Sequence, residues 1–287
     1  MAAVRPLMLA GIALAGFALG GLAFRHAGIA APGTAQLQEK TAPPNVDAEL
    51  VIAVDVSYSM DPDEQALQRE GYILGLTSPE FLNALKQGLH GRIAVTYFEW
   101  AGEKDQKAVT PWRLIDGEAT AKAVADEIAA APYRRSYRTS ISGALLYAAP
   151  LFGTSEFRGV RRVVDVSGDG ANNQGPPVNV VRDQLLEQGI TINGLPLVLK
   201  RPNSRYMDID NLDVYYEDCV IGGPGSFVVP IRDRESFKEA TRTKLVQEVA
   251  GIAPAPKVIP ASAQAPRVSC LIGEQMWRYR WGGVDFQ

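Results

Sequence analysis

Short apolar runs alternate with amphipathic segments along most of the chain. Runs of apolar and β-branched residues predict strands over residues 49–55, 92–100, 160–167, 190–199 and 226–231. Apolar residues at helical spacing predict helices over residues 64–76, 79–87, 118–131, 178–188 and 233–251. Residues 108–114 predict an antiparallel edge strand, because Pro111 fits an edge position. Strands that alternate with helices predict an α/β fold with a doubly wound, mostly parallel sheet.

The first strand ends in a cluster of polar residues. The apolar run 50–54 stops at Asp55, and Ser57 and Ser59 follow at alternate positions. A strand without a polar face is typical of a parallel sheet, which binds its ligands at the carboxyl ends of its strands. Three oxygen side chains without imidazole or thiolate favour Mg²⁺, Mn²⁺ or Ca²⁺. The same spacing also fits a turn, with Ser59 as a helix N-cap.

Two later segments bring oxygen side chains to the same edge. Thr139 and Ser140 stand where a helix begins; Ser140 fits an N-cap, whereas Thr139 lies one step earlier and can face a shared site. Asp169 follows the strand at 160–167 and is flanked by glycines, which permit close backbone approach. An Asp-Gly pair is also an ordinary turn signal. Asp165 lies within the strand, where alternation points it away from the loop.

Composition removes several classes of function. The chain has 46% hydrophobic and 21% charged residues, as in ordinary globular proteins, and its net charge of −3 gives no reason to expect nucleic acid binding. The two histidines, His26 and His90, are too few for a zinc site of His/Cys type. The sequence also lacks G-x-S-x-G, a Walker A loop and a G-x-G-x-x-G after a strand, so most common enzyme classes lose support.

The N-terminus has the pattern of an export signal. Arg5 precedes an uncharged run, 7–24, and small residues follow it, so we assign residues 1–35 to a signal peptide and cleavage region. The run is also long enough for a membrane anchor, so membrane attachment is expected only if it stays uncleaved. Residues 36–47 are polar with two prolines and predict a linker. We therefore expect an exported protein of the bacterial periplasm or cell surface.

The cysteines and the C-terminal half leave alternatives open. Cys219 and Cys270 predict one disulfide in an oxidising compartment, or else two separate buried thiols. The insertion 200–225 reads as a solvated acidic loop, with a second metal site as the alternative. The tail 252–287 is expected to pack on the domain. Within it, residues 277–281 alternate aromatic residues with arginine and predict a strand, whose aromatic face would either pack on the domain or bind a partner.

The three polar segments, taken in this order, resemble the metal-ion-dependent adhesion site of von Willebrand factor A domains. The matching motifs are V-D-V-S-Y-S at 54–59, R-T-S-I at 138–141 and S-G-D-G at 167–170, and the resemblance covers residues 48–251. Gly168 departs from the family, which often has Thr or Ser directly before the acid. The chain is most similar to exported bacterial members of this superfamily.

The resemblance implies a Rossmann-like sheet with a divalent cation at its carboxyl edge, usually Mg²⁺, with Ca²⁺ and Mn²⁺ as alternatives. Ser57, Ser59 and Thr139 would coordinate it through hydroxyls, and Asp55 and Asp169 often through waters. Two carboxylates only neutralise a dication, so a Glu or Asp from a protein partner would complete the site. This implies a non-enzymatic, metal-dependent protein-binding module.

Two other functions remain possible for the same residues. One is a metal-assisted phosphohydrolase that uses Asp55 as nucleophile or ligand. The other is a purely structural domain with the same fold. If the binding function holds, the basic and aromatic loop 133–138, next to Thr139, is expected to rim the metal face and to influence partner choice; a plain solvated connection is the alternative.

Overall fold

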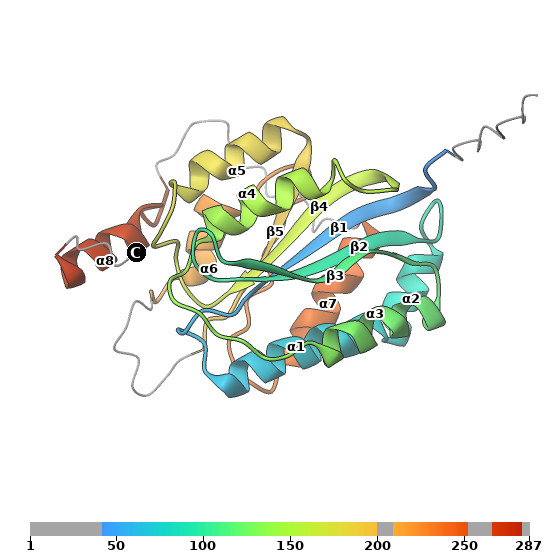
Figure 1. Cartoon of the computed structure of the whole chain (residues 1–287), viewed down its shortest axis with the longest axis horizontal. Coiled ribbons are helices and arrows are strands. Elements are labelled where there is room, and N and C mark those ends of the chain that lie inside the picture. The colour runs from blue at the N-terminus through green and yellow to red at the C-terminus, as the bar shows by residue number, and fades with distance from the viewer. Residues whose placement is uncertain (1–41, 200–208, 252–265, 283–287) are drawn as a thin grey trace, which may run out of the picture. The chain divides into compact units, whose positions relative to one another are not determined.

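Five strands form one sheet in the computed structural model, which describes residues 42–199, 209–251 and 266–282. Their order is β3-β2-β1-β4-β5 (Figure 1). β1 pairs in parallel with β2 and β4, β4 pairs in parallel with β5, and β3 is antiparallel to β2. The α/β, doubly wound, mostly parallel sheet with one antiparallel edge strand is confirmed. The strands are β1 Asn45–Asp55, β2 Ile93–Trp100, β3 Gln106–Ile115, β4 Arg158–Gly168 and β5 Ile190–Pro196.

Helices cover both faces of this sheet (Figure 1). α1, α2, α3 and α7 lie on one face, and α4, α5 and α6 lie on the other. Their bounds are α1 Pro62–Leu76, α2 Pro79–Lys86, α3 Glu118–Ala130, α4 Ile141–Leu151, α5 Val178–Glu187, α6 Leu212–Tyr215 and α7 Phe237–Ala250. A π-helical turn, Tyr216–Val220, continues α6, and a last helix, α8, spans Ile272–Trp281.

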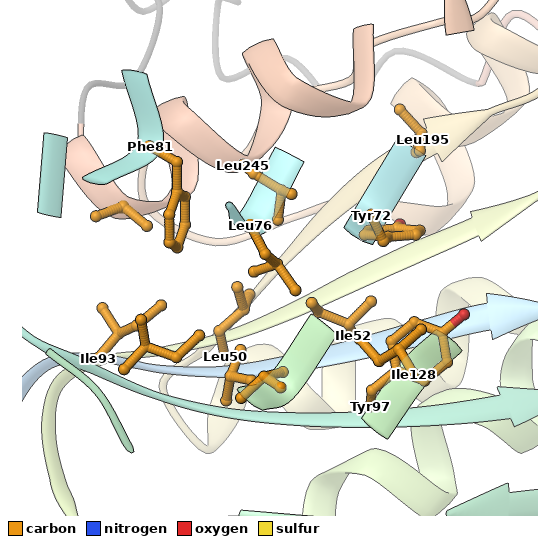
Figure 2. Packing of buried hydrophobic residues seen from close by; sticks show 14 of the residues in the cluster. Leu50, Ile52, Tyr72, Leu76, Phe81, Ile93, Tyr97, Ile128, Leu195 and Leu245 are labelled. Atoms are coloured by element: carbon orange, nitrogen blue, oxygen red, sulfur yellow. The ribbon is translucent and has the colours of Figure 1, made fainter. Parts of the chain in front are cut away.

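Alternation along β1 decides which helices each side chain meets. Leu50 and Ile52 point to the face of α1, α2, α3 and α7, where they meet Tyr72 and Leu76 (Figure 2). Val51 and the other odd-numbered residues pack with the helices of the opposite face. The continuous apolar run of β1 is therefore explained by burial on both sides. By the same alternation, the side chain of Asp55, the last residue of the strand, points to the face covered by α4, α5 and α6.

The first strand begins earlier than expected. β1 starts at Asn45, inside the segment 36–47 assigned to a linker. Asp47 is buried there because its carboxylate accepts hydrogen bonds from the backbone N–H groups of His90 (2.8 Å) and Arg92 (3.2 Å). Asp47, a polar residue within β1, thus stabilises the turn that precedes β2. The signal region 1–35 and residues 36–41 lie outside the described residues.

Two expectations for the C-terminal half are wrong. Residues 226–231 form isolated bridges beside β5, at Val228 and Ile231, in place of a regular strand. The described part of the insertion, 209–225, is not a solvated loop, because Tyr215, Tyr216 and Cys219 are buried in the core. Three of its acidic residues form ion pairs with arginines: Asp213 with Arg232 at 2.6 Å, and Glu217 and Asp218 with Arg267.

The strand predicted over residues 277–281 is also wrong, since these residues belong to α8. Five alternating residues are too few to separate a strand from a helix, and burial follows the helical period. Gly273 is buried and Trp277 is half-buried four residues on, whereas Tyr279 is 96% exposed. The tail residues 252–265 and 283–287 lie outside the described residues.

A disulfide joins Cys219 of the π-helical turn to Cys270, just before α8. The prediction of one bridge is confirmed, and the alternative of two separate thiols is excluded. Within residues 42–199, 209–251 and 266–282, no helix is long and apolar enough to cross a membrane. The apolar segment 7–24 lies outside these ranges.

Candidate metal site

Asp55 stands at the carboxyl end of β1, in the middle of the sheet. Its Oδ1 atom accepts a hydrogen bond from the backbone N–H of Ser57 at 2.7 Å, which turns the chain sharply after the strand. The side chain is fully buried. Its other oxygen, Oδ2, has no hydrogen-bond partner among the described residues. The strand therefore delivers a carboxylate to the sheet edge with one oxygen still available.

The hydroxyls of the same loop connect this strand to β4. Ser57 Oγ lies 2.6 Å from Ser59 Oγ, and Ser59 Oγ donates to Asp169 Oδ1 at 2.6 Å. Asp169 directly follows β4, which pairs with β1 in parallel. Four of the five candidate ligands predicted from the sequence are thus linked in one cluster by direct contacts.

Thr139 joins the cluster through the loop that carries Asp169. Its backbone N–H donates to Asn173 Oδ1 (3.0 Å), and its carbonyl accepts from the Asn173 N–H (2.8 Å). A Cβ placed on Gly170 would lie 3.7 Å from both Oγ1 and Cγ2 of Thr139, so the side chain lies against the loop of Asp169. Ser140 is the N-cap of α4, since its Oγ accepts from the Gly143 N–H at 3.0 Å. Ser140 therefore caps the helix while Thr139 remains for the site.

Burial and like charge raise the pKa of Asp55 well above its usual value. Removal from water is the largest cause, and the neighbouring carboxylate of Asp169 is the second; the hydrogen bonds from Ser57 act in the opposite direction. Two carboxylates held close together in a buried position disfavour their own ionisation. A bound cation would remove this penalty, so the protein without metal is electrostatically prepared to accept one.

The oxygen set fits a hard divalent cation. Neighbouring ligands of an octahedral Mg²⁺ lie about 3 Å apart, given bonds of about 2.1 Å. The separations of 2.6 Å among the Ser57, Ser59 and Asp169 oxygens are near this spacing. No group of three or more His, Cys, Asp or Glu side chains gathers in the described part of the chain. The site would thus consist of three hydroxyls and two carboxylates, a set of hard oxygen donors that can hold a divalent cation.

Several residues that support the site were not predicted. Gln68 of α1 donates to Ser167 Oγ at 2.8 Å, one residue before the end of β4. Asn172 Oδ1 accepts from the backbone N–H of Ser142, and its Nδ2 donates to Glu274 Oε1 of α8 at 2.7 Å. The sequence offered one sign of this support, the pair Asn172-Asn173 after Gly170, and such a pair is typical of any turn.

The basic, aromatic loop 133–138 lies beside the candidate ligands. Its Ser136 exchanges backbone hydrogen bonds with Val56 (3.1 Å) and Tyr58 (2.8 Å), so it extends the end of β1. The rings of Tyr58 and Tyr137 stack with centroids 4.5 Å apart, and the two residues are 48% and 76% exposed. Arg135 Nη2 donates to the carbonyl groups of Tyr58 and Met60. The loop thus places Tyr137 against Tyr58, which lies between Ser57 and Ser59, so that two exposed tyrosines adjoin the candidate ligands.

Solved structures share this fold. The proximal thread matrix protein 1 of the mussel byssus aligns over 72% of this chain and 48% of its own, with 14% identity and a TM-score of 0.50. The pilus adhesin SpaC from Lactobacillus rhamnosus GG aligns over 73% and 31%, with 10% identity and a TM-score of 0.50. A von Willebrand factor type A structure from Catenulispora acidiphila aligns over 72% and 43%, with 14% identity and a TM-score of 0.44. The alignments span less than half of each of these structures.

The sheet order and the likenesses to the thread matrix protein and the pilus adhesin show the fold of a von Willebrand factor A domain, as the motif resemblance predicted. A search of curated proteins gives no match. A family model described as "Protein of unknown function (DUF1194)" matches residues 45–253, which is most of the chain, and the chain belongs to this family.

Proposed function

We propose that this protein is a non-enzymatic module that binds a divalent cation and, through it, an acidic residue of a protein partner. The observation that carries the proposal is the cluster of Asp55, Ser57, Ser59 and Asp169 at the carboxyl edge of the sheet, with Thr139 beside it. Mg²⁺ is the favoured ion, with Ca²⁺ and Mn²⁺ as alternatives, because all five side chains offer hard oxygen atoms.

Charge balance supports a partner carboxylate as the missing ligand. Asp55 and Asp169 supply two negative charges, which neutralise a dication and leave coordination positions to fill. Neutral hydroxyls from Ser57, Ser59 and Thr139 add no further negative charge, so the site does not repel an incoming Glu or Asp, which can fill an open coordination position. The chemistry that this arrangement favours is capture of an anion, with Asp55 and Asp169 holding the ion in place.

The exposed tyrosine pair gives the partner a second point of contact. Tyrosine is enriched at protein interfaces because it buries a large, rigid surface and keeps a polar end. Tyr58 is one residue from Ser57 and one from Ser59, and its ring is stacked on Tyr137. A partner whose acid reaches the ion would therefore cover this pair.

The bacterial envelope is the proposed location. The export signal predicted from the sequence of residues 1–35 supports it, and so does the disulfide between Cys219 and Cys270, since such bonds persist in oxidising compartments. One of the structures of similar fold is a bacterial pilus adhesin, SpaC from Lactobacillus rhamnosus GG, which agrees with this location.

Calorimetric titration of Mg²⁺, Ca²⁺ and Mn²⁺ into the chelator-stripped protein tests the metal site. Asp55→Ala is expected to lose ion binding. The matched control is Asp126→Ala, which removes an exposed carboxylate that pairs with Lys122 on α3 and is not one of the candidate ligands. The control is expected to bind as the wild type does. Loss of binding in both variants, or in neither, contradicts the assignment of Asp55.

Partner capture is tested with the same variants. Immobilised wild-type protein is expected to retain an envelope protein in Mg²⁺ and to release it in EDTA, whereas Asp55→Ala retains nothing. Capture by Asp55→Ala in EDTA would refute the metal-dependent mechanism. A wild-type protein that binds no divalent cation and no partner would leave a structural domain as its function.

A further inference from the structure

Two buried oxygen atoms without hydrogen-bond partners in the described residues approach the same point beside Gly168. One is Oδ2 of Asp55 and the other is the hydroxyl of Tyr216; neither makes a hydrogen bond within the described residues. Both side chains are fully buried. Buried polar atoms in folded proteins are nearly always paired, so two at one place require an explanation.

Gly168 defines the space between them. A Cβ placed on this glycine would lie 2.9 Å from Asp55 Oδ2 and 3.1 Å from the Tyr216 hydroxyl. Both atoms therefore approach the same point from different elements, and only the absence of a side chain at residue 168 leaves room for them. The backbone of Gly168 does not have a positive φ angle, so space and not backbone conformation explains the glycine.

Tyr216 is held firmly in this position. It begins the π-helical turn Tyr216–Val220, a rare conformation that often occurs at functional sites. Its ring packs against Gly194 of β5, where an added Cβ would lie 2.6 Å from Tyr216 Cδ1. The disulfide of Cys219 fixes the same turn to Cys270. The packing of its ring and the disulfide of its turn thus hold Tyr216 in place.

Donor and acceptor are complementary at this point. Burial and the nearby charge of Asp55 raise the pKa of Tyr216 well above its usual value, so the hydroxyl keeps its proton and can donate. An ionised Asp55 can only accept. A hydrogen bond from a neutral hydroxyl stabilises a carboxylate, which is the form that a metal site requires.

We infer that Tyr216 is a positioning residue of this site: its hydroxyl donates a hydrogen bond to Asp55 Oδ2, directly or through one water molecule, and orients the carboxylate toward the cation. The inference rests on the proposed function for the role of the cation. The contact with Asp55 itself does not depend on any metal. Tyr216 would act through Asp55 and would not bind the ion.

A titration of Mg²⁺ into Tyr216→Phe tests the role. The variant removes one oxygen atom and keeps the packing of the ring. The dissociation constant for Mg²⁺ is expected to rise about tenfold, as for other residues that orient a metal ligand. The matched control is Tyr97→Phe, which removes another fully buried hydroxyl without a partner in the described residues, on β2. The control is expected to bind Mg²⁺ as the wild type does.

A double-mutant cycle in EDTA tests the contact without metal. Urea unfolding is measured for wild type, Tyr216→Phe, Asp55→Ala and the double variant. If the hydroxyl interacts with the carboxylate, the effects of the two substitutions on the unfolding equilibrium constant differ from independence by about fivefold. Tyr97→Phe with Asp55→Ala provides the control cycle, in which the effects multiply.

The two measurements separate the inference from the proposed function. If the wild type binds Mg²⁺ and Tyr216→Phe binds it equally well, Tyr216 does not position Asp55 and the inference is wrong. If the wild type binds no divalent cation, the proposed function fails, and the cycle decides the contact alone: independent effects of Tyr216→Phe and Asp55→Ala then overturn it. Weaker Mg²⁺ binding by Tyr216→Phe, together with coupling to Asp55 in the EDTA cycle, would exclude a merely structural effect.

Discussion

Gly168 is the residue at which a single methyl group would disturb the candidate site most directly. An added Cβ would come within 2.9 Å of Asp55 Oδ2 and 3.1 Å of the Tyr216 hydroxyl, and both side chains are buried with little room to move. We expect Gly168→Ala to lower the free energy of unfolding by about 1–3 kcal/mol, the usual cost of overpacking. Urea unfolding in EDTA measures this change.

Gly170→Ala is the control for that substitution. Gly170 lies on the other side of Asp169, and its added Cβ would meet Thr139 at an ordinary 3.7 Å. The control is expected to change stability by less than about 0.5 kcal/mol. Equal losses in both variants would show that the loop, and not the space shared by Asp55 and Tyr216, is sensitive to substitution.

Sequence reasoning found the candidate ligands but not the residues that support them, and distance along the chain explains the difference. Asp55, Ser57 and Ser59 are neighbours, and Asp169 ends a strand that could be predicted to pair beside theirs. Tyr216 reaches the same point from an insertion whose path no local pattern specifies. Two tyrosines and a cysteine of this segment are buried in the core. The acidic residues around them predicted a solvated loop instead.

At the scale of single elements, α8 depends on the disulfide for its place on the domain. The helix contacts two loops near the candidate ligands. Glu274 accepts a hydrogen bond from Asn172, after β4, and the ring centroid of Trp277 lies 3.5 Å from the Arg138 guanidinium, before α4. We expect the double variant Cys219→Ser, Cys270→Ser to lose amide-exchange protection in α8, while β1 keeps its protection. Hydrogen exchange read by mass spectrometry measures both. Protection of α8 equal to that of wild type would show that the noncovalent contacts suffice.

A buried ion cluster fixes α7 to the opposite face of the sheet. Lys244 Nζ lies 2.5 Å from Asp165 Oδ1 and 2.7 Å from Glu248 Oε1, and all three side chains are buried. Burial raises the pKa of Asp165 to about 6, although the positive charge of Lys244 acts against this rise. The sequence placed Asp165 away from the loop correctly, because alternation within β4 assigns it to this face.

The raised pKa makes stability depend on pH in a defined direction. Between pH 4 and pH 6 the folded protein holds a proton on Asp165 that the unfolded chain has released, so the free energy of unfolding falls as pH rises through this window. The loss due to Asp165 amounts to about 3 kcal/mol. We expect the stability of wild type relative to Asp165→Asn to be greatest near pH 4 and to decline toward pH 7 in urea unfolding. A relative stability that rises over the window would show that Lys244 lowers the pKa instead.

At the scale of the whole molecule, the predictable part of the fold is the part set by strand and helix periodicity. Alternating strands and helices predicted a mostly parallel sheet with one antiparallel edge strand, and the observed order β3-β2-β1-β4-β5 brings the ends of β1 and β4 side by side. The C-terminal third was predicted least well. There, a disulfide and buried aromatic residues replace regular periodicity, so tertiary contacts and not local pattern decide the structure.

Because the candidate ligands come from three loops, two of which follow the central strands β1 and β4, ion binding is expected to stabilise the entire domain. A ligand that binds only the folded chain adds about 2.7 kcal/mol at a concentration one hundred times its dissociation constant, which for a domain of this size raises Tm by about 5–10 °C. Calorimetric melting with excess Mg²⁺ and with EDTA measures the increment. Asp55→Asn removes one of the two buried carboxylate charges, so its melting in EDTA is expected to match or exceed that of wild type, with no increment from Mg²⁺. The same increment in both proteins would mean that Mg²⁺ stabilises the chain at another place.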